Sequence, residues 1–201
     1  MRKLIVLSFI SLDGVMQAPG GKGEDPSGGF DKEGWTVPFF DDALSAEMGK
    51  QMGQPFDLLL GRKTYEIFAG YWPKQQEGDI GAGINKAVKY VVGTTEIDTS
   101  WEQTVQIKDD VSAEIRKLKA TDGPMLQVHG SGNLIQTLLA EDLIDELWLK
   151  TYPVTLGKGK RLFGEGTIPA AFKLIESKTS PSGVVIASYE RAGEVETGSF
   201  G

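Results

Sequence analysis

The sequence predicts an α/β fold with a mixed, mostly parallel sheet that is flanked by helices and carries an antiparallel hairpin at its C-terminal end. Two observations lead to this prediction. Short, almost continuous apolar runs are typical of strands covered on both faces, and they occur at residues 4–10, 56–60, 88–92 and 125–128. Helical patterns lie between these runs, and strands that alternate with helices indicate a parallel sheet.

Three segments of the sequence have a helical pattern. Val111, Ile115 and Leu118 follow a 3.6-residue period after Asp109 and Asp110, which suit a helix start. Residues 134–139 form a second apolar stripe at helical spacing, and residues 38–52 form a third, with acids early and Lys50 late.

The last third of the chain changes character, and this is the observation that predicts the hairpin. Its strand-like segments lie at residues 144–154, 172–178 and 184–189. The last two flank Thr179-Ser180-Pro181-Ser182-Gly183, a turn signal between antiparallel strands.

Composition narrows the functional classes. A chain of 201 residues suits one domain, expected over residues 1–192, with a flexible tail over 193–201. A net charge of −7 argues against nucleic acid as a partner. The sequence has no cysteine and only one histidine, His129, which excludes disulfides and multi-histidine metal sites, so that no metal is expected.

The same composition bears on location. The absence of cysteine suits a reducing compartment, and the expected location is the cytoplasm. The first apolar run, Leu4 to Ile10, is too short to span a membrane and is interpreted as a first strand.

A glycine-rich stretch over residues 17–37 has almost no periodicity. Irregular segments of that length inside a compact domain are often lids or binding loops. The alternative interpretation is a disordered insertion.

Three junctions at which a strand ends in a glycine are candidates for binding phosphate. The first is Gly61-Arg62-Lys63-Thr64, where two cations open a helix, and the second is Gly130-Ser131-Gly132-Asn133-Leu134. The third, Gly93-Thr94-Thr95, offers hydroxyl groups. Plainer interpretations remain: Arg62 and Lys63 could be two solvated cations without a ligand, and Thr94 and Thr95 could merely cap a turn. Ligands of open α/β sheets bind beyond the carboxyl ends of the strands, so we expect all three junctions to face one crevice.

These junctions, together with Ser11-Leu12-Asp13-Gly14 and the segment Pro153 to Phe163, resemble the dihydrofolate-reductase-like fold. They are most similar to the reductase domain of the bifunctional riboflavin-biosynthesis deaminase–reductase, over about residues 3–191. The resemblance implies a homodimer that transfers a hydride from NADPH to a small heterocyclic, ribosylamino or pterin-type substrate.

The resemblance also implies roles for single residues. Those expected to bind the cofactor are Gly61, Arg62, Lys63, Thr64, Thr94, Thr95, Gly130, Ser131, Gly132, Asn133 and Leu134. Asp13 is expected near the substrate, and Trp35 is similar to a tryptophan of the pterin pocket in dihydrofolate reductases.

Two aspartates are candidates for the proton donor that hydride transfer requires. Asp41 and Asp42 follow Phe39 and Phe40, whose rings would raise the pKa of a neighbouring carboxyl group. The alternative is that both aspartates merely open a helix. Lys158 and Lys160 are candidates for attracting an anionic substrate, and the alternative is a solvated basic loop.

Two other functions remain open at this point. One is a true dihydrofolate reductase, and the other is a nucleotide-binding dimer without catalytic activity.

Overall fold

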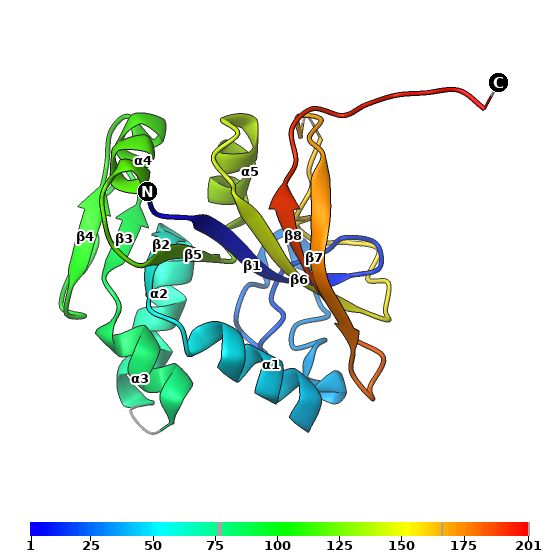
Figure 1. Ribbon diagram of the computed structural model, residues 1–201. Helices are drawn as coiled ribbons and strands as arrows, with labels where there is room; N and C mark the ends of the chain where they lie inside the picture. The colour runs from blue at the N-terminus through cyan, green and yellow to red at the C-terminus, as the bar shows by residue number, and fades with distance from the viewer. Residues whose placement is uncertain (76–77, 166, 201) are drawn as a thin grey trace.

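The computed structural model describes residues 1–75, 78–165 and 167–200. In this part of the chain, the strands form one mixed sheet in the order β4-β3-β2-β5-β1-β6-β8-β7 (Figure 1). Their bounds are β1 (Leu4–Ser11), β2 (Phe56–Gly61), β3 (Lys89–Val92), β4 (Thr104–Ile107), β5 (Met125–His129), β6 (Glu146–Tyr152), β7 (Phe172–Thr179) and β8 (Val185–Arg191).

Strand direction confirms the predicted fold class. Strands β1 to β6 pair in parallel, whereas β8 runs antiparallel to both β6 and β7. The carboxyl ends of β1, β2, β3 and β5 therefore point the same way and lie along one edge of the sheet.

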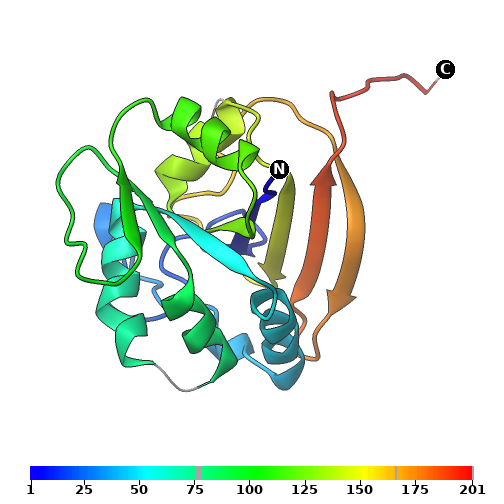
Figure 2. The same cartoon turned by 60° about the vertical axis from the view of Figure 1, so that its left-hand side comes forward.

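Helices cover both faces of the sheet. Figures 1 and 2 show α4 and α5 on one side and α1, α2 and α3 on the other. The helices are α1 (Asp42–Met52), α2 (Arg62–Tyr71), α3 (Asp79–Lys86), α4 (Val111–Ala120) and α5 (Gly132–Ala140). None of the helices in the described ranges has both the length and the apolar character needed to cross a bilayer.

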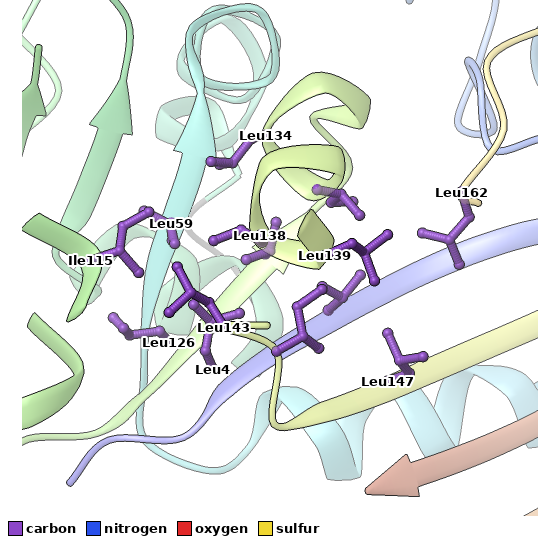
Figure 3. Close-up of a cluster of buried hydrophobic side chains, with 14 of the residues drawn as sticks. Leu4, Leu59, Ile115, Leu126, Leu134, Leu138, Leu139, Leu143, Leu147 and Leu162 are labelled. Atoms are coloured by element: carbon purple, nitrogen blue, oxygen red, sulfur yellow. The ribbon is translucent and has the colours of Figure 1, made fainter. Parts of the chain in front are cut away.

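The contact between α5 and the sheet fixes the position of one candidate junction. Leu138 and Leu139 of α5 pack with Leu4 and Leu126 of the strands, and all four are buried (Figure 3). Burying one leucine side chain stabilises a fold by about 1.5–3 kcal/mol. This apolar anchor holds the N-terminus of α5 at the carboxyl edge of the sheet.

The structure differs from the predicted elements at three places. The expected helix over residues 38–52 begins only at Asp42, after a short 3₁₀ helix (Val37–Phe39), because Asp41 adopts an extended conformation and caps α1. Neither α3 nor β4 was expected. The first contains two glycines, Gly81 and Gly83, and the second is a short strand with only one buried residue, Ile107.

The glycine-rich stretch forms a loop with many internal hydrogen bonds. Gln17 Nε2 donates to the carbonyl oxygens of Asp25 and Ser27, each at 2.9 Å. Trp35 Nε1 donates to the Gln17 carbonyl oxygen at 2.8 Å, and Thr36 Oγ1 donates to that of Pro19 at 2.6 Å. The loop between β1 and α1 is thus a structured wall of the molecule. Residues 192–200 carry no helix or strand, and after Gly193 the chain extends away from the body (Figure 1).

Candidate active site

The three glycine junctions lie side by side. The backbone N–H of Gly61 donates to Ser131 Oγ at 2.8 Å, and that hydroxyl donates to Thr64 Oγ1 at 2.7 Å. Gly93 lies against the side chain of Arg62, where a Cβ added to the glycine would be 3.3 Å from the Arg62 Cβ. The ends of β2, β3 and β5 therefore meet in one place, as the sequence predicts.

Glycine is required at two of these positions. A Cβ on Gly61 would lie 3.1 Å from both Cβ and Oγ of Ser131, so a side chain there would separate the first two junctions. Gly130 has φ +67°, in the left-handed region that glycine adopts without strain. Ser131 also has a positive φ of 67°, which turns the chain sharply before α5 begins.

A first cavity, of about 420 Å³, opens at these junctions. We call it the basic cavity, because three cations reach it from two sides. Its lining residues are Gly61, Arg62, Lys63, Val92, Val111, Ser131, Gly132, Asn133, Leu134, Thr137 and Lys160.

The backbone at the basic cavity suits an oxygen-rich anion. Neither α2 nor α5 has a side-chain cap on its first amide groups. A Cβ on Gly132 would meet no atom within 4 Å, so the backbone there is open to a close approach. Uncapped amide groups at helix N-termini, together with cations, are the usual elements of a phosphate site. The donors at this cavity are therefore chemically suited to the phosphates of a dinucleotide.

Thr94 and Thr95 lie just outside this cavity. Both threonines are exposed and neither lines it. Gln106 Nε2 holds their turn by donating to the carbonyl oxygens of Gly93 at 2.8 Å and Thr95 at 2.5 Å. The sequence offered no sign of this role for Gln106, since the strand that carries it was not expected.

A second cavity, of about 330 Å³, adjoins the first and shares Ser131, Gly132 and Lys160 with it. We call it the apolar cavity. Its other lining residues are Leu7, Ser8, Phe9, Met16, Gln17, Ala18, Pro19, Gly20, Glu24, Asp25, Met48, Met52, Thr64, Ile67, Phe68, Trp72, Ile80, Ile84, His129 and Gly130.

The glycine-rich loop supplies the two acidic groups of the apolar cavity, and the segment between β6 and β7 supplies Lys160. Lys160 Nζ lies 2.5 Å from Asp25 Oδ2. Burial alone would raise the pKa of Asp25, but the hydrogen bonds from Lys160 and Ser27 outweigh burial, and the pKa is lowered. Burial raises the pKa of Glu24, whose Oε2 accepts a hydrogen bond from the Gly20 N–H at 2.6 Å. Glu24 is thus an acid of this cavity that burial biases toward holding a proton.

Polar side chains lie beneath the apolar cavity. His129 Nε2 is 2.9 Å from Gln127 Oε1, and burial, with repulsion from Lys150, lowers the histidine pKa to about 3. Lys150 is fully buried and donates to Gln51 Oε1. Burial lowers the pKa of Lys150 to about 7. At neutral pH the imidazole that faces this cavity is therefore uncharged.

The predicted proton donors lie elsewhere. Asp41 caps α1, where its Oδ1 accepts from the Leu44 N–H at 2.8 Å and its Oδ2 from the Ser182 N–H at 3.0 Å. These hydrogen bonds, that of Leu44 above all, lower the pKa of Asp41 to about 2. The expectation of a raised pKa is wrong for Asp41, because the backbone amide groups around it stabilise its charge. Asp42 is the first residue of α1, and neither aspartate lines the two cavities.

Of the residues expected to bind the substrate, only Lys160 lines a cavity. Asp13 accepts hydrogen bonds from Ser11 Oγ at 2.6 Å and from the N–H groups of Leu156 and Gly157, which lower its pKa to about 2. Trp35 packs edge-on against Tyr152, with ring centroids 5.2 Å apart. Asp13, Trp35 and the exposed Lys158 line neither cavity, whereas Lys160 lines both.

Several residues of the apolar cavity had no signal in the sequence. Glu24 and Asp25 lie in the irregular loop, and the five isoleucine and methionine side chains that the helices contribute gave no sign of a cavity, namely Met48, Met52, Ile67, Ile80 and Ile84. Trp72 also lines this cavity. Only the tertiary contact of the loop with α1 and α2 brings these residues together.

A wider groove, of about 1040 Å³, lies along α2 and includes Tyr65 and Trp101. It contains more acidic than basic residues, with Glu66, Glu96, Asp98 and Glu102 against Lys86. Carboxylates repel a polyanion, so this groove is a poor match for a dinucleotide.

Comparison with known proteins adds family information to this geometry. The family model of the RibD C-terminal domain matches residues 2–186. An uncharacterised protein of Bacillus subtilis (strain 168), YyaP, is 31% identical over 196 residues, which are 94% of each chain.

Solved structures share the fold. A putative riboflavin biosynthesis protein from Shewanella sp. PV-4 has a TM-score of 0.60 at 24% identity, over 96% of this chain and 99% of that one. A pyrimidine reductase-like protein from Corynebacterium diphtheriae has a TM-score of 0.62 at 12% identity, over 96% and 93%. A dihydrofolate reductase from Enterococcus faecalis in complex with NADP(H) has a TM-score of 0.57 at 12% identity, over 94% and 96%.

Proposed function

Because this chain belongs to the family of RibD C-terminal domains, we propose that it is a reductase that uses NADPH to reduce a small heterocyclic or similar planar substrate. One observation carries the proposal. A cavity lined with cations and open amide groups adjoins a mostly apolar cavity, and the two share Ser131, Gly132 and Lys160. A cofactor whose phosphates bind in the first cavity would bring its reactive ring to the boundary with the second, where an apolar substrate would bind.

The residues of the basic cavity have distinct parts in this proposal. The N–H groups at Gly132 and Asn133 would bind the pyrophosphate, and Arg62 and Lys63 would bind the 2′-phosphate that distinguishes NADPH from NADH. Thr64 holds Ser131 in place through the hydrogen bond between their hydroxyl groups. When bound, NADPH supplies the hydride.

A proton must also reach the substrate, and we assign it to Glu24. Its carboxyl group lines the apolar cavity and is biased toward the protonated form by burial. Asp25 is held as a carboxylate by Lys160, and His129 is neutral with its Nε2 against Gln127. Glu24 therefore replaces Asp41 and Asp42 as the candidate acid.

The test is cofactor binding by the wild-type chain and by the variant Arg62→Ser/Lys63→Ser. A hundredfold excess of NADPH over its dissociation constant stabilises the folded state by about 2.7 kcal/mol, visible as a raised melting temperature. We expect the variant to bind NADPH at least about tenfold more weakly, since each charged contact contributes more than 1 kcal/mol.

The chain offers a matched control in Arg116→Ser/Lys117→Ser. Arg116 and Lys117 form the same dipeptide on α4, are exposed, and pair with Glu141 and Glu114 outside both cavities. This control is expected to bind NADPH as the wild type does. No stabilisation of the wild type by NADPH at millimolar concentration would refute the proposal.

One observation favours a second candidate, a nucleotide-binding protein without catalytic activity. The aspartates expected to donate a proton lie outside the cavities, as described above. Such a protein would bind NADPH without oxidising it in the presence of any acceptor, so a steady fall in NADPH absorbance with an added acceptor separates the two. Dihydrofolate is one acceptor to include, because the dihydrofolate reductase alternative predicts rapid turnover with it.

The expected homodimer stays a prediction. The edge strand β7 exposes Leu174 and Ile175, about half of each side chain, and a second copy could cover them. Sedimentation velocity would give the oligomeric state directly.

A further inference from the structure

The apolar cavity indicates which class of substrate the proposed reductase takes. Its walls are aliphatic, thioether and aromatic groups from the sheet and from α1 to α3, including Leu7, Phe9, Met48, Met52 and Ile84. A ligand with little polar surface gains binding free energy against such walls, roughly 25 cal/mol for each Å² of apolar area removed from water. Methionine side chains also adapt their shape to a flat ligand.

The described lining of this cavity offers no free positive charge. Lys160 is the one cation among the described lining residues, and it is paired with Asp25. Lys150 lies beneath the cavity, does not line it, and donates to Gln51. A substrate phosphate would thus find no uncompensated cation, and an unpaired charge in a mostly apolar site is unfavourable.

Aromatic side chains suit a conjugated ring. The ring centroid of Phe68 lies 6.0 Å from that of His129 and 6.1 Å from that of Trp72. Aromatic groups at such spacing offer faces and edges to a flat π-system. A volume of about 330 Å³ is near the lower end for small-molecule sites, and about the size for one or two fused rings.

From these contacts we propose that the substrate is a neutral, mostly apolar, conjugated carbonyl compound of one or two rings, such as a quinone, and not a phosphorylated ribosylamino pyrimidine. The inference rests on the proposed reductase function. For a quinone, NADPH, the quinone and one proton give NADP⁺ and the hydroquinone, so two electrons and two hydrogens reach the acceptor. Neither a metal nor a further reductant is needed.

The test separates binding from turnover. Isothermal titration of the cofactor-free protein would use 2-naphthol, a neutral two-ring probe, and ribose 5-phosphate, a probe for a sugar-phosphate site. We expect saturable binding of 2-naphthol and no binding of ribose 5-phosphate. Turnover of 2-methyl-1,4-naphthoquinone would then be followed by the loss of NADPH absorbance.

Two variants locate the binding site. Ile67 lines the cavity and is 38% exposed, so Ile67→Lys introduces a charge at its rim without burying that charge in the core. The matched control is Val105→Lys on β4, where the valine is 47% exposed and lies outside both cavities. We expect 2-naphthol to bind Ile67→Lys at least tenfold more weakly and Val105→Lys as tightly as the wild type. Phe68→Ala, which removes an aromatic wall, should weaken binding in the same direction.

The outcomes distinguish the two proposals. Binding of ribose 5-phosphate, or binding of 2-naphthol that neither Ile67→Lys nor Phe68→Ala weakens, overturns the substrate class while NADPH binding can still stand. Binding of 2-naphthol at this cavity without any NADPH binding supports the apolar ligand class and refutes the reductase. Turnover of the quinone by the wild type and by Val105→Lys, with a raised KM in Ile67→Lys, supports both.

Discussion

The two cavities share three residues but differ in the groups that line them. The basic cavity is formed by the ends of strands and the starts of helices, where glycines expose the backbone and Arg62 and Lys63 add charge. The apolar cavity is formed by side chains of helices and of an irregular loop, and its charged pair, Lys160 and Asp25, is internally compensated. Backbone geometry therefore defines one site, and side-chain packing defines the other.

Because of this difference, the two cavities can be altered independently. Substitutions in the helix faces alter the apolar cavity without touching the turns at Gly61 and Gly130. We thus expect the cofactor site to be sensitive to glycine replacement and the substrate site to be sensitive to charge.

The largest expected effect concerns Lys150, beneath the apolar cavity. The pKa of Lys150 is lowered to about 7 from 10.5, so between these pH values the unfolded chain binds more protons than the folded one. The free energy of unfolding should therefore rise with pH from 7 to 10.5, by a few kcal/mol. Urea unfolding at several pH values would measure this, and Lys150→Met should make the dependence shallower.

A second buried lysine provides the control. Lys89 lies outside both cavities, and burial lowers its pKa to about 8. Lys89→Met should remove a smaller part of the same pH dependence, at its alkaline end. Equal slopes in the wild type and in Lys150→Met would show that the charge of Lys150 is not penalised by burial.

The next effect concerns the proton donor. Glu24→Gln keeps the size of the side chain and removes the acid, so we expect kcat for the reductase to fall by about 100-fold or more, with NADPH affinity unchanged. In the wild type, kcat should fall as the pH rises through the raised pKa of Glu24. A pH–rate profile of both proteins tests this, and Asp31→Asn, a change to an exposed acid of the same loop outside the cavities, is the control. An unchanged profile in Glu24→Gln would remove Glu24 from the mechanism.

The substitution Gly61→Ala should disturb Ser131, one of the residues that the two cavities share. The new methyl group would lie 3.1 Å from Ser131, and such crowding costs about 1–3 kcal/mol of stability. Weaker NADPH binding should accompany it, because Ser131 would move. Gly70→Ala in α2 is the counterpart, since its methyl group meets no atom within 4 Å, and it should stabilise the protein by about 0.5–1 kcal/mol. Thermal unfolding and NADPH titration of both variants are the measurements, and equal behaviour would contradict the account.

The smallest expected effect lies outside both cavities. Asp41→Ala removes the cap of α1 and should lower the melting temperature, whereas Asp42→Ala should leave the melting temperature nearly unchanged. Neither substitution should change kcat of the reductase. A large loss of kcat in Asp41→Ala, with the fold intact, would restore this aspartate as the proton donor.

The sequence predicted the basic cavity better than the apolar one. Glycines at strand ends leave a local signal, and Gly61, Gly130 and Gly132 were expected where they lie. Glu24 was not expected, because its role depends on how an irregular loop folds back over α1 and α2. Asp41 was assigned the wrong pKa mainly because it caps α1 and accepts a hydrogen bond from the Leu44 N–H, a local contact, to which the Ser182 N–H, 141 residues away in the sequence, adds.

The fold was predictable to a similar extent. Buried parallel strands and the C-terminal hairpin have strong sequence patterns, and all were located within a few residues. The missed elements, α3 and β4, have weak local preferences and are held by their neighbours, as the parallel pairing of Tyr90 with Val105 shows.

A crystal structure with NADP⁺ tests the central claim most directly. The phosphates should lie within hydrogen-bonding distance of the Gly132 and Asn133 amide groups, with the nicotinamide ring at the boundary formed by Ser131 and Lys160. Density for NADP⁺ in the groove beside Tyr65 and Trp101 instead would contradict the assignment of the basic cavity.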